Sequence, residues 1–101
     1  MAVVEVSISP LGTKEPGISA YVAGCVRIAR ESGISCQLTP MGTVFEGDLD
    51  AILAVIRTMQ ESVFASGAQR VSTSIKIDDR RDGVVHSMER KVQAVETKLK
   101  G

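Results

Sequence analysis

Hydrophobic and polar side chains alternate in two stretches of the chain. In residues 2–9, Val4, Val6 and Ile8 share one face of an extended chain, and polar side chains share the other. Residues 70–78 repeat this pattern. A period of two is typical of a half-buried β-strand, so the sequence predicts a strand in each stretch.

Two other stretches have the period of an α-helix. Between residues 18 and 32, apolar side chains recur every three or four positions until Gly33 interrupts them. A second apolar stripe covers residues 49–63, and either Asp48 or Asp50 can cap its first turn. We therefore expect two amphipathic helices.

A β-hairpin is predicted between these helices. Two short strand-like segments, Ile34 to Thr39 and Thr43 to Glu46, are joined by Pro40, Met41 and Gly42. Proline fixes φ and glycine accepts the positive φ that other residues resist, so the three connecting residues form a tight turn.

The predicted order of elements is βαββαβ. With right-handed crossovers, this order gives an α+β, ferredoxin-like two-layer sandwich, in which two helices cover one face of a four-stranded antiparallel sheet. We expect one domain over residues 1–101. The uncovered face carries short polar side chains, many of them serines, and it can meet water, another subunit or a small ligand. Because these side chains are small, contact with another subunit or with a small ligand is favoured over contact with water alone. We therefore expect a homo-oligomer.

A third helix is predicted from about Val84 to Lys98. Its apolar residues are spaced three, four, three and four positions apart, as in the narrow seam of a coiled coil. Such a seam indicates a helical partner, although the helix can also pack along the edge of its own domain. The seam residues are Val85, Met88, Val92, Val95 and Leu99.

Composition excludes some classes of function. Acidic and basic residues balance at twelve each in 101 residues, so no overall field attracts nucleic acid or an anionic membrane. No apolar run approaches the roughly 18–20 residues of a membrane span, and the first residues do not resemble a signal peptide. We expect a cytoplasmic protein that binds neither nucleic acid nor membrane.

The titratable residues do not suggest a metal site or a catalytic nucleophile. Cys25 and Cys36 lack a second pair or clustered histidines, and we expect buried, reduced thiols. In residues 78–82, DDRRD, arginines interleaved with carboxylates would repel a divalent cation, which favours a loop or subunit ion-pair network. His86 is the single histidine and is expected on a solvated helix surface.

Four stretches of the sequence resemble the small thiamine-binding-protein family. They are SPLGTKEPGISAYVA, SGISCQLTPMGTVFEGDLDAI, GAQRVSTSIKIDDRRD and MERKVQAV, and they occur in the family's order over nearly the whole chain. The resemblance implies a ferredoxin-like fold, assembly into dimers and tetramers, and vitamin binding rather than catalysis. The implied ligand is thiamine or its hydroxymethylpyrimidine moiety, and no further cofactor is implied.

The hairpin supplies chemistry that suits such a ligand. The hydroxyls of Thr39 and Thr43 can donate or accept hydrogen bonds, Met41 can contact a ring, and Glu46 can pair with the pyrimidine edge or the thiazolium charge. The loop after the first strand lies at the same end of the predicted sheet and can complete a pocket. The predicted ligand-binding residues are Ser9, Ser19, Tyr21, Thr39, Met41, Gly42, Thr43 and Glu46.

Each of these residues also has an interpretation without a ligand. Proline, glycine and threonine can serve the hairpin alone, and Tyr21 can belong to the core. Glu46 lies roughly 10 Å along its strand from Thr43, so both can contact one ligand only if it lies along the sheet face. Otherwise Glu46 belongs to a subunit contact or to a solvated strand end.

Two functions from different classes are therefore open. The first is a non-catalytic carrier, buffer or sensor of thiamine or hydroxymethylpyrimidine. The second is a structural or regulatory homo-oligomer that binds another small metabolite or none. An acylphosphatase-like enzyme is disfavoured because the sequence contains no asparagine and the first loop no arginine. An RNA-binding module of this topology is disfavoured because its central strands carry no aromatic residues.

Overall fold

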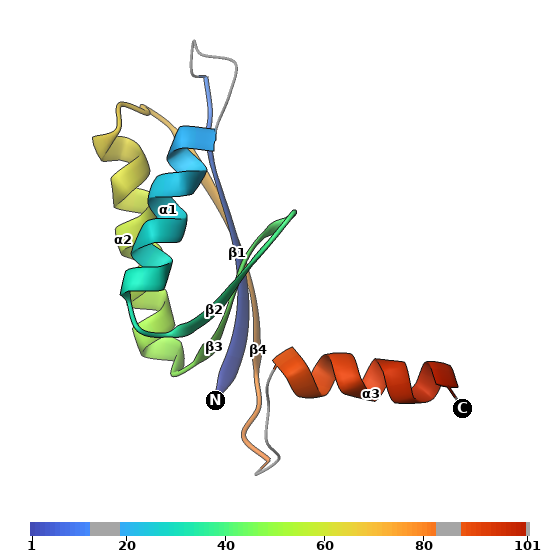
Figure 1. The fold of residues 1–101 in the computed structure, drawn as a ribbon. Helices are drawn as coiled ribbons and strands as arrows, with labels where there is room; N and C mark the ends of the chain where they lie inside the picture. Colours follow the sequence, from blue (N-terminus) through green and yellow to red (C-terminus); the bar gives the residue numbers. More distant parts are fainter. Residues whose placement is uncertain (13–18, 83–87, 101) are drawn as a thin grey trace.

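The computed structural model describes residues 1–12, 19–82 and 88–100 (Figure 1). The order of its elements is the predicted βαββαβ followed by a C-terminal helix. The start of the third helix was predicted near Val84, and residues 83–87, including Val85 and His86, lie outside the described residues. The elements are β1 (Ala2–Pro10), α1 (Ser19–Glu31), β2 (Ser35–Thr39), β3 (Gly42–Gly47), α2 (Leu49–Ala65), β4 (Val71–Asp79) and α3 (Met88–Lys100).

The four strands form one antiparallel sheet in the order β2-β3-β1-β4. Helices α1 and α2 pack against each other on one face of it (Figure 1). This arrangement confirms the predicted ferredoxin-like α+β sandwich. Strand β1 pairs with β4 along its whole length, but it pairs with β3 only from Ala2 to Val6.

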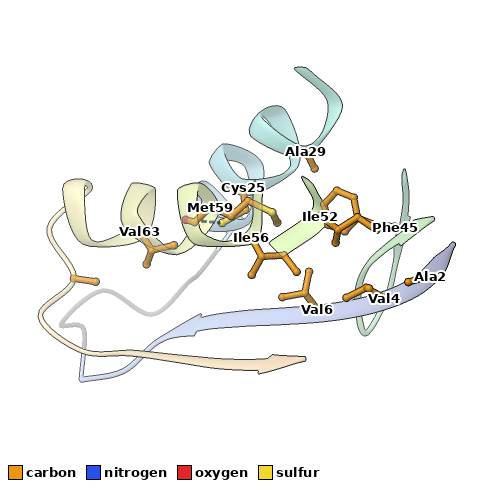
Figure 2. Packing of buried hydrophobic residues seen from close by; sticks show 11 residues of the cluster. Ala2, Val4, Val6, Cys25, Ala29, Phe45, Ile52, Ile56, Met59 and Val63 are labelled. Carbon is orange, nitrogen blue, oxygen red and sulfur yellow. Dashed lines mark hydrogen bonds between the residues drawn. The ribbon is translucent and has the colours of Figure 1, made fainter. Parts of the chain in front are cut away.

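The hydrophobic core fills the space between the sheet and the two helices (Figure 2). Val4 of β1, Phe45 of β3 and Ile52 of α2 are each fully buried there. Burying one such side chain stabilises the fold by about 1.5–3 kcal/mol. The alternation predicted for β1 places Val4 toward the core, and the stripe predicted for α2 does the same for Ile52.

Local side-chain and main-chain groups set where the elements begin and end. The carboxylate of Asp48, rather than that of Asp50, caps α2 by accepting a hydrogen bond from the Ala51 amide at 3.0 Å. After α2, Gly67 has a φ of 112°, which glycine adopts without the clash that a side chain would cause. The hairpin turn contains Gly42, whose φ is 151°.

Helix α3 extends away from the sheet on the side opposite α1 and α2 (Figure 1). Its side chains over residues 92–99 are all exposed. Three of them, Val92, Val95 and Leu99, form the described part of the predicted apolar seam. In this structure that seam does not pack along the edge of its own domain.

Candidate ligand-binding site

A hollow lies between the β2–β3 hairpin, the second half of β1 and helix α1. Its volume is about 150 Å³. The pocket is on the helix-covered side of the sheet, because α1 and α2 supply part of its wall. It is lined by Val6, Ser7, Ile8, Ser9, Val22, Cys25, Val26, Leu38, Thr39, Pro40, Met41, Gly42, Thr43 and Met59.

The structure brings most of the predicted ligand-binding residues together at this pocket. Tyr21 lies outside the lining and packs, half-buried, against the core. Ser19 is the first residue of α1, and its side chain lies outside the described part of the structure. The predicted residues that line the pocket are Ser9, Thr39, Met41, Gly42 and Thr43.

Thr39 and Gly42 hold the shape of the hairpin. The Thr39 hydroxyl donates to the Gly42 carbonyl oxygen at 3.0 Å and accepts from the Met41 amide at 3.2 Å. A side chain at Gly42 would collide with the main-chain carbonyl of Val6, so this turn presses directly against β1. The interpretation of Thr39 as hairpin chemistry is therefore supported by its two bonds within the turn.

Thr43 differs from Thr39 because its hydroxyl has no hydrogen-bond partner among the described residues. The residue is only 6% exposed and lies opposite Val6 on the helix-covered face. Among the described residues no hydrogen bond reaches its side chain, which lines the pocket. Leaving a buried hydroxyl unsatisfied costs about 1–3 kcal/mol. Thr43 is therefore the lining residue with the clearest need for a partner.

Cys25 forms part of the pocket wall, which sequence reasoning did not foresee. Its thiol donates to the Met59 carbonyl oxygen at 3.6 Å (Figure 2). Burial raises the pKa of the Cys25 thiol, and its contact with the Ser62 hydroxyl partly offsets that effect. The group facing the pocket is thus a neutral thiol at physiological pH.

The apolar part of the wall was also missed as a site. Val22, Val26 and Met59 belong to the helical stripes that predict core, and a stripe does not distinguish side chains that face a cavity from side chains that fill it. The usable signal was the prediction that the loop after the first strand lies at the same end of the sheet as the hairpin turn. It places the end of β1 beside the hairpin turn, where the pocket is found.

Glu46 does not belong to this pocket. It lies opposite Val3, at the far end of β3 from the turn, and the Ser35 hydroxyl donates to its carboxylate at 3.3 Å. Residues 43 and 46 are three positions apart on one strand, so their side chains point to opposite faces. No ligand lying on one face can contact both side chains.

The charged segment after β4 forms local ion pairs. Arg80 contacts Asp82 at 2.8 Å, and Arg81 contacts Asp79 at 2.9 Å. Both pairs join residues two positions apart, which fits a loop-fixing role. The residues described by the structure contain no group of three or more potential metal ligands, and none of their helices is long and apolar enough to cross a membrane.

The sequence profile of the thiamine-binding protein family matches residues 4–96. The chain belongs to this family. A relative of this chain has nearly the same length: the UPF0045 protein YqgV of Bacillus subtilis is 44% identical, and the match covers 98% of each chain.

Solved structures agree with the fold of this thiamine-binding family member. Hypothetical protein MJ1052 of Methanocaldococcus jannaschii superposes with a TM-score of 0.85 at 38% identity, over 94% of this chain and 95% of the other. A candidate thiamine biosynthesis/salvage protein of Thermotoga maritima, TM0486, has a TM-score of 0.79 at 17% identity, over 93% and 97% of the two chains. The second likeness supports the shared fold alone.

Proposed function

We propose that this protein binds thiamine through its hydroxymethylpyrimidine moiety and serves as a carrier, buffer or sensor of the vitamin without catalysing a reaction. The observation that carries the proposal is a ring-sized pocket, uncharged in its described lining, in a chain of the thiamine-binding family. A cavity of about 150 Å³ is large enough for one benzene-sized ring, whereas pockets for drug-sized ligands have about 300–1,000 Å³. One pyrimidine fits this volume better than the whole vitamin does.

The lining also favours the pyrimidine over the rest of thiamine. Its described residues include no acidic or basic side chain, so a buried thiazolium cation or phosphate would have no charged partner among them. The pyrimidine is neutral, and its polar edge needs only hydroxyl and main-chain groups. The thiazolium ring then lies at the mouth, where the exposed side chains of Leu38 and Met41 provide apolar and sulfur contacts.

The pocket chemistry is that of a binding site. Cys25 is the one titratable side chain in the described lining, and burial holds it as a thiol rather than as the nucleophilic thiolate. The described lining offers no base next to a hydroxyl and no pair of carboxylates for proton transfer. Binding without turnover is the function that these groups can perform.

We propose further that the protein works as a homo-oligomer, either a dimer or a tetramer. Two surfaces support assembly: the uncovered polar face of the sheet and the exposed apolar seam of α3, whose Val92, Val95 and Leu99 are 57%, 58% and 80% exposed. The seam of α3 contributes no residue to the pocket lining, whereas Ser7 and Ser9 of the uncovered face also line the pocket. Ligand binding and assembly through α3 can therefore be tested separately.

Isothermal titration with thiamine, thiamine diphosphate and hydroxymethylpyrimidine tests the ligand, with a thermal-shift scan in parallel. A ligand at a hundred times its dissociation constant stabilises the folded state by about 2.7 kcal/mol, a shift of many degrees in a domain of this size. Saturable heat with both hydroxymethylpyrimidine and thiamine is expected. If none of the three compounds gives heat or a shift, the assembly-only function becomes the better explanation.

A further inference from the structure

The main chain of β1 has an edge that no strand covers. At its two ends, the Leu11 amide donates to the Arg70 carbonyl oxygen at 2.8 Å, and the Arg80 amide donates to the Met1 carbonyl oxygen at 3.3 Å. Odd-numbered residues of β1 therefore direct their main-chain groups toward β4. Because these groups alternate sides along a strand without a bulge, even-numbered residues direct theirs toward β3.

The hairpin ends before β1 does. Pairing with β3 ends where Val6 lies opposite Thr43, and the Val6 carbonyl oxygen faces the Gly42 turn as the alternation requires. Ile8 is the next even-numbered residue, and beyond the turn no strand lies on that side. Pro10 follows and has no amide hydrogen, which suits an uncovered edge.

Ile8 thus has an amide N–H and a carbonyl group on the same side of β1, both without a strand partner. Among the described residues no other main-chain hydrogen bond reaches either group. Ile8 also lines the pocket, as does the unpartnered Thr43 hydroxyl. Three polar groups without a partner among the described residues therefore border this cavity: the two main-chain groups of the half-buried Ile8 and the hydroxyl of the buried Thr43. Buried polar groups in folded proteins are nearly always paired, so a ligand that covers this edge has to supply partners.

We infer that the Ile8 main chain and the Thr43 hydroxyl form the polar edge of the ligand site. This edge takes a ring with a hydrogen-bond acceptor beside a donor, as in the amidine edge of a 4-aminopyrimidine. The ring nitrogen accepts from the Ile8 N–H, the exocyclic amine donates to the Ile8 carbonyl oxygen, and Thr43 bonds a further polar group of the ring. The inference rests on the proposed function and adds the atoms that select the ligand.

This arrangement resembles the addition of a strand to an open sheet edge, with a small planar molecule in place of the peptide. Main-chain groups are rigid and neutral, so they can select a pattern of donors and acceptors without a charged side chain. A site of this kind rejects an analogue that cannot complete the pattern, because the unpaired groups stay buried. Such a site does not bind a phosphorylated ligand more tightly than an unphosphorylated one.

Amide hydrogen exchange measured by NMR tests the Ile8 contact directly. In the free protein the Ile8 amide should exchange much faster than those of Ser7 and Ser9, which bond toward β4. Saturating hydroxymethylpyrimidine should slow exchange at Ile8 by at least about tenfold and leave Ser7 and Ser9 nearly unchanged. Saturable binding with unchanged exchange at Ile8 would overturn only this inference, whereas absence of any binding would overturn the proposed function as well.

A ligand variant and two protein variants test the rest of the edge. The 4-dimethylamino analogue of hydroxymethylpyrimidine has no donor at that position and should bind at least tenfold more weakly. Thr43→Val should weaken hydroxymethylpyrimidine binding about three- to tenfold, and Thr43→Ser, which keeps the hydroxyl, should stay close to wild type. Thr58→Val on the exposed surface of α2 is the matched control.

Thermal unfolding separates a ligand contact from a structural one. Without ligand, Thr43→Val should not lower Tm, because it removes a hydroxyl that has no partner among the residues the structure describes. A marked loss of stability, or equal affinity for the amino and dimethylamino rings, would contradict the assignment of this edge.

Discussion

Thr39 and Thr43 flank the same turn, yet their side chains have different tasks. Thr39 donates to and accepts from main-chain groups of the turn, whereas Thr43 lies buried in the pocket wall with its hydroxyl unpaired. Both were predicted as ligand-binding residues from the sequence, because a threonine hydroxyl offers the same hydrogen bonds at either position. What separates them is the turn geometry, which depends on the contact between Gly42 and Val6.

Replacement of Gly42 by alanine should damage both the fold and the pocket. Its φ of 151° is strained for any residue with a side chain, and the new methyl group would meet main-chain atoms of β1 that cannot move aside. We expect a loss of about 1–3 kcal/mol in the free energy of unfolding, measured by urea denaturation.

Gly24→Ala is the control for that variant. Gly24 lies inside α1 with open space where a methyl group would be, so the change should be neutral or should stabilise the protein by about 0.5–1 kcal/mol. If the two alanine variants unfolded at the same urea concentration, the close approach of the turn to β1 would be refuted.

The two cysteines should react at different rates with an alkylating reagent. Burial disfavours the thiolate of Cys25, so its pKa lies above the ordinary 9.0, and less thiolate is present at any pH below that value. Cys36 is half-buried and should be labelled first at pH 8. Labelling of Cys25 should rise only at higher pH, as followed by mass spectrometry of digested protein.

A bound ligand should protect Cys25 further, because this residue lines the pocket and Cys36 does not. Saturating hydroxymethylpyrimidine should therefore slow labelling of Cys25 and leave the rate at Cys36 unchanged. Equal protection of both thiols would indicate that the ligand stabilises the whole fold and does not cover the Cys25 thiol directly.

At the scale of elements, much of the structure follows from local patterns. Alternation located β1 and β4, and the Pro40 to Gly42 stretch located the hairpin, because each signal arises within a few residues. The pocket does not arise locally. It depends on β3 ending at Gly42 while β1 continues to Pro10, and strand boundaries are less certain than strand positions in any reading of sequence.

The same limit applies to individual site residues. The period of two would have placed Thr43 and Glu46 on opposite faces from sequence alone, whereas the unpaired main chain of Ile8 has no side-chain signature at all. Cys25 and Met59 were indistinguishable from core because apolar side chains form both. Sequence reasoning thus reached the polar half of the pocket and missed its apolar and main-chain parts.

The start of α2 allows a test of a single helix cap. Asp48→Ala removes the carboxylate that accepts from the Ala51 amide and should cost about 1 kcal/mol in the free energy of unfolding. Asp50→Ala is the matched control, since it removes an acidic residue from the first turn without removing the cap. The measurement is urea unfolding followed by circular dichroism, and equal midpoints for the two variants would contradict Asp48 as the cap.

At the scale of the whole molecule, helix α3 carries an exposed apolar surface that suits a partner. The helix extends away from the domain (Figure 1), and its apolar seam is exposed. Burial of such a seam against a second helix is energetically favourable. Val92 is the first residue of the described seam. Val92→Glu places a charge where the partner helix would pack and should shift the protein toward a smaller species in sedimentation velocity.

The control for association is Thr97→Glu, which adds the same charge to α3 outside the seam. This variant should sediment like wild type. Because the pocket lies on the far side of the sheet from α3, affinity for hydroxymethylpyrimidine should be unchanged in both variants if each subunit forms its own site. An unchanged sedimentation profile for Val92→Glu would refute the seam as an interface and leave the uncovered sheet face as the surface for assembly. Loss of ligand affinity together with loss of assembly would instead mean that the partner subunit completes the pocket.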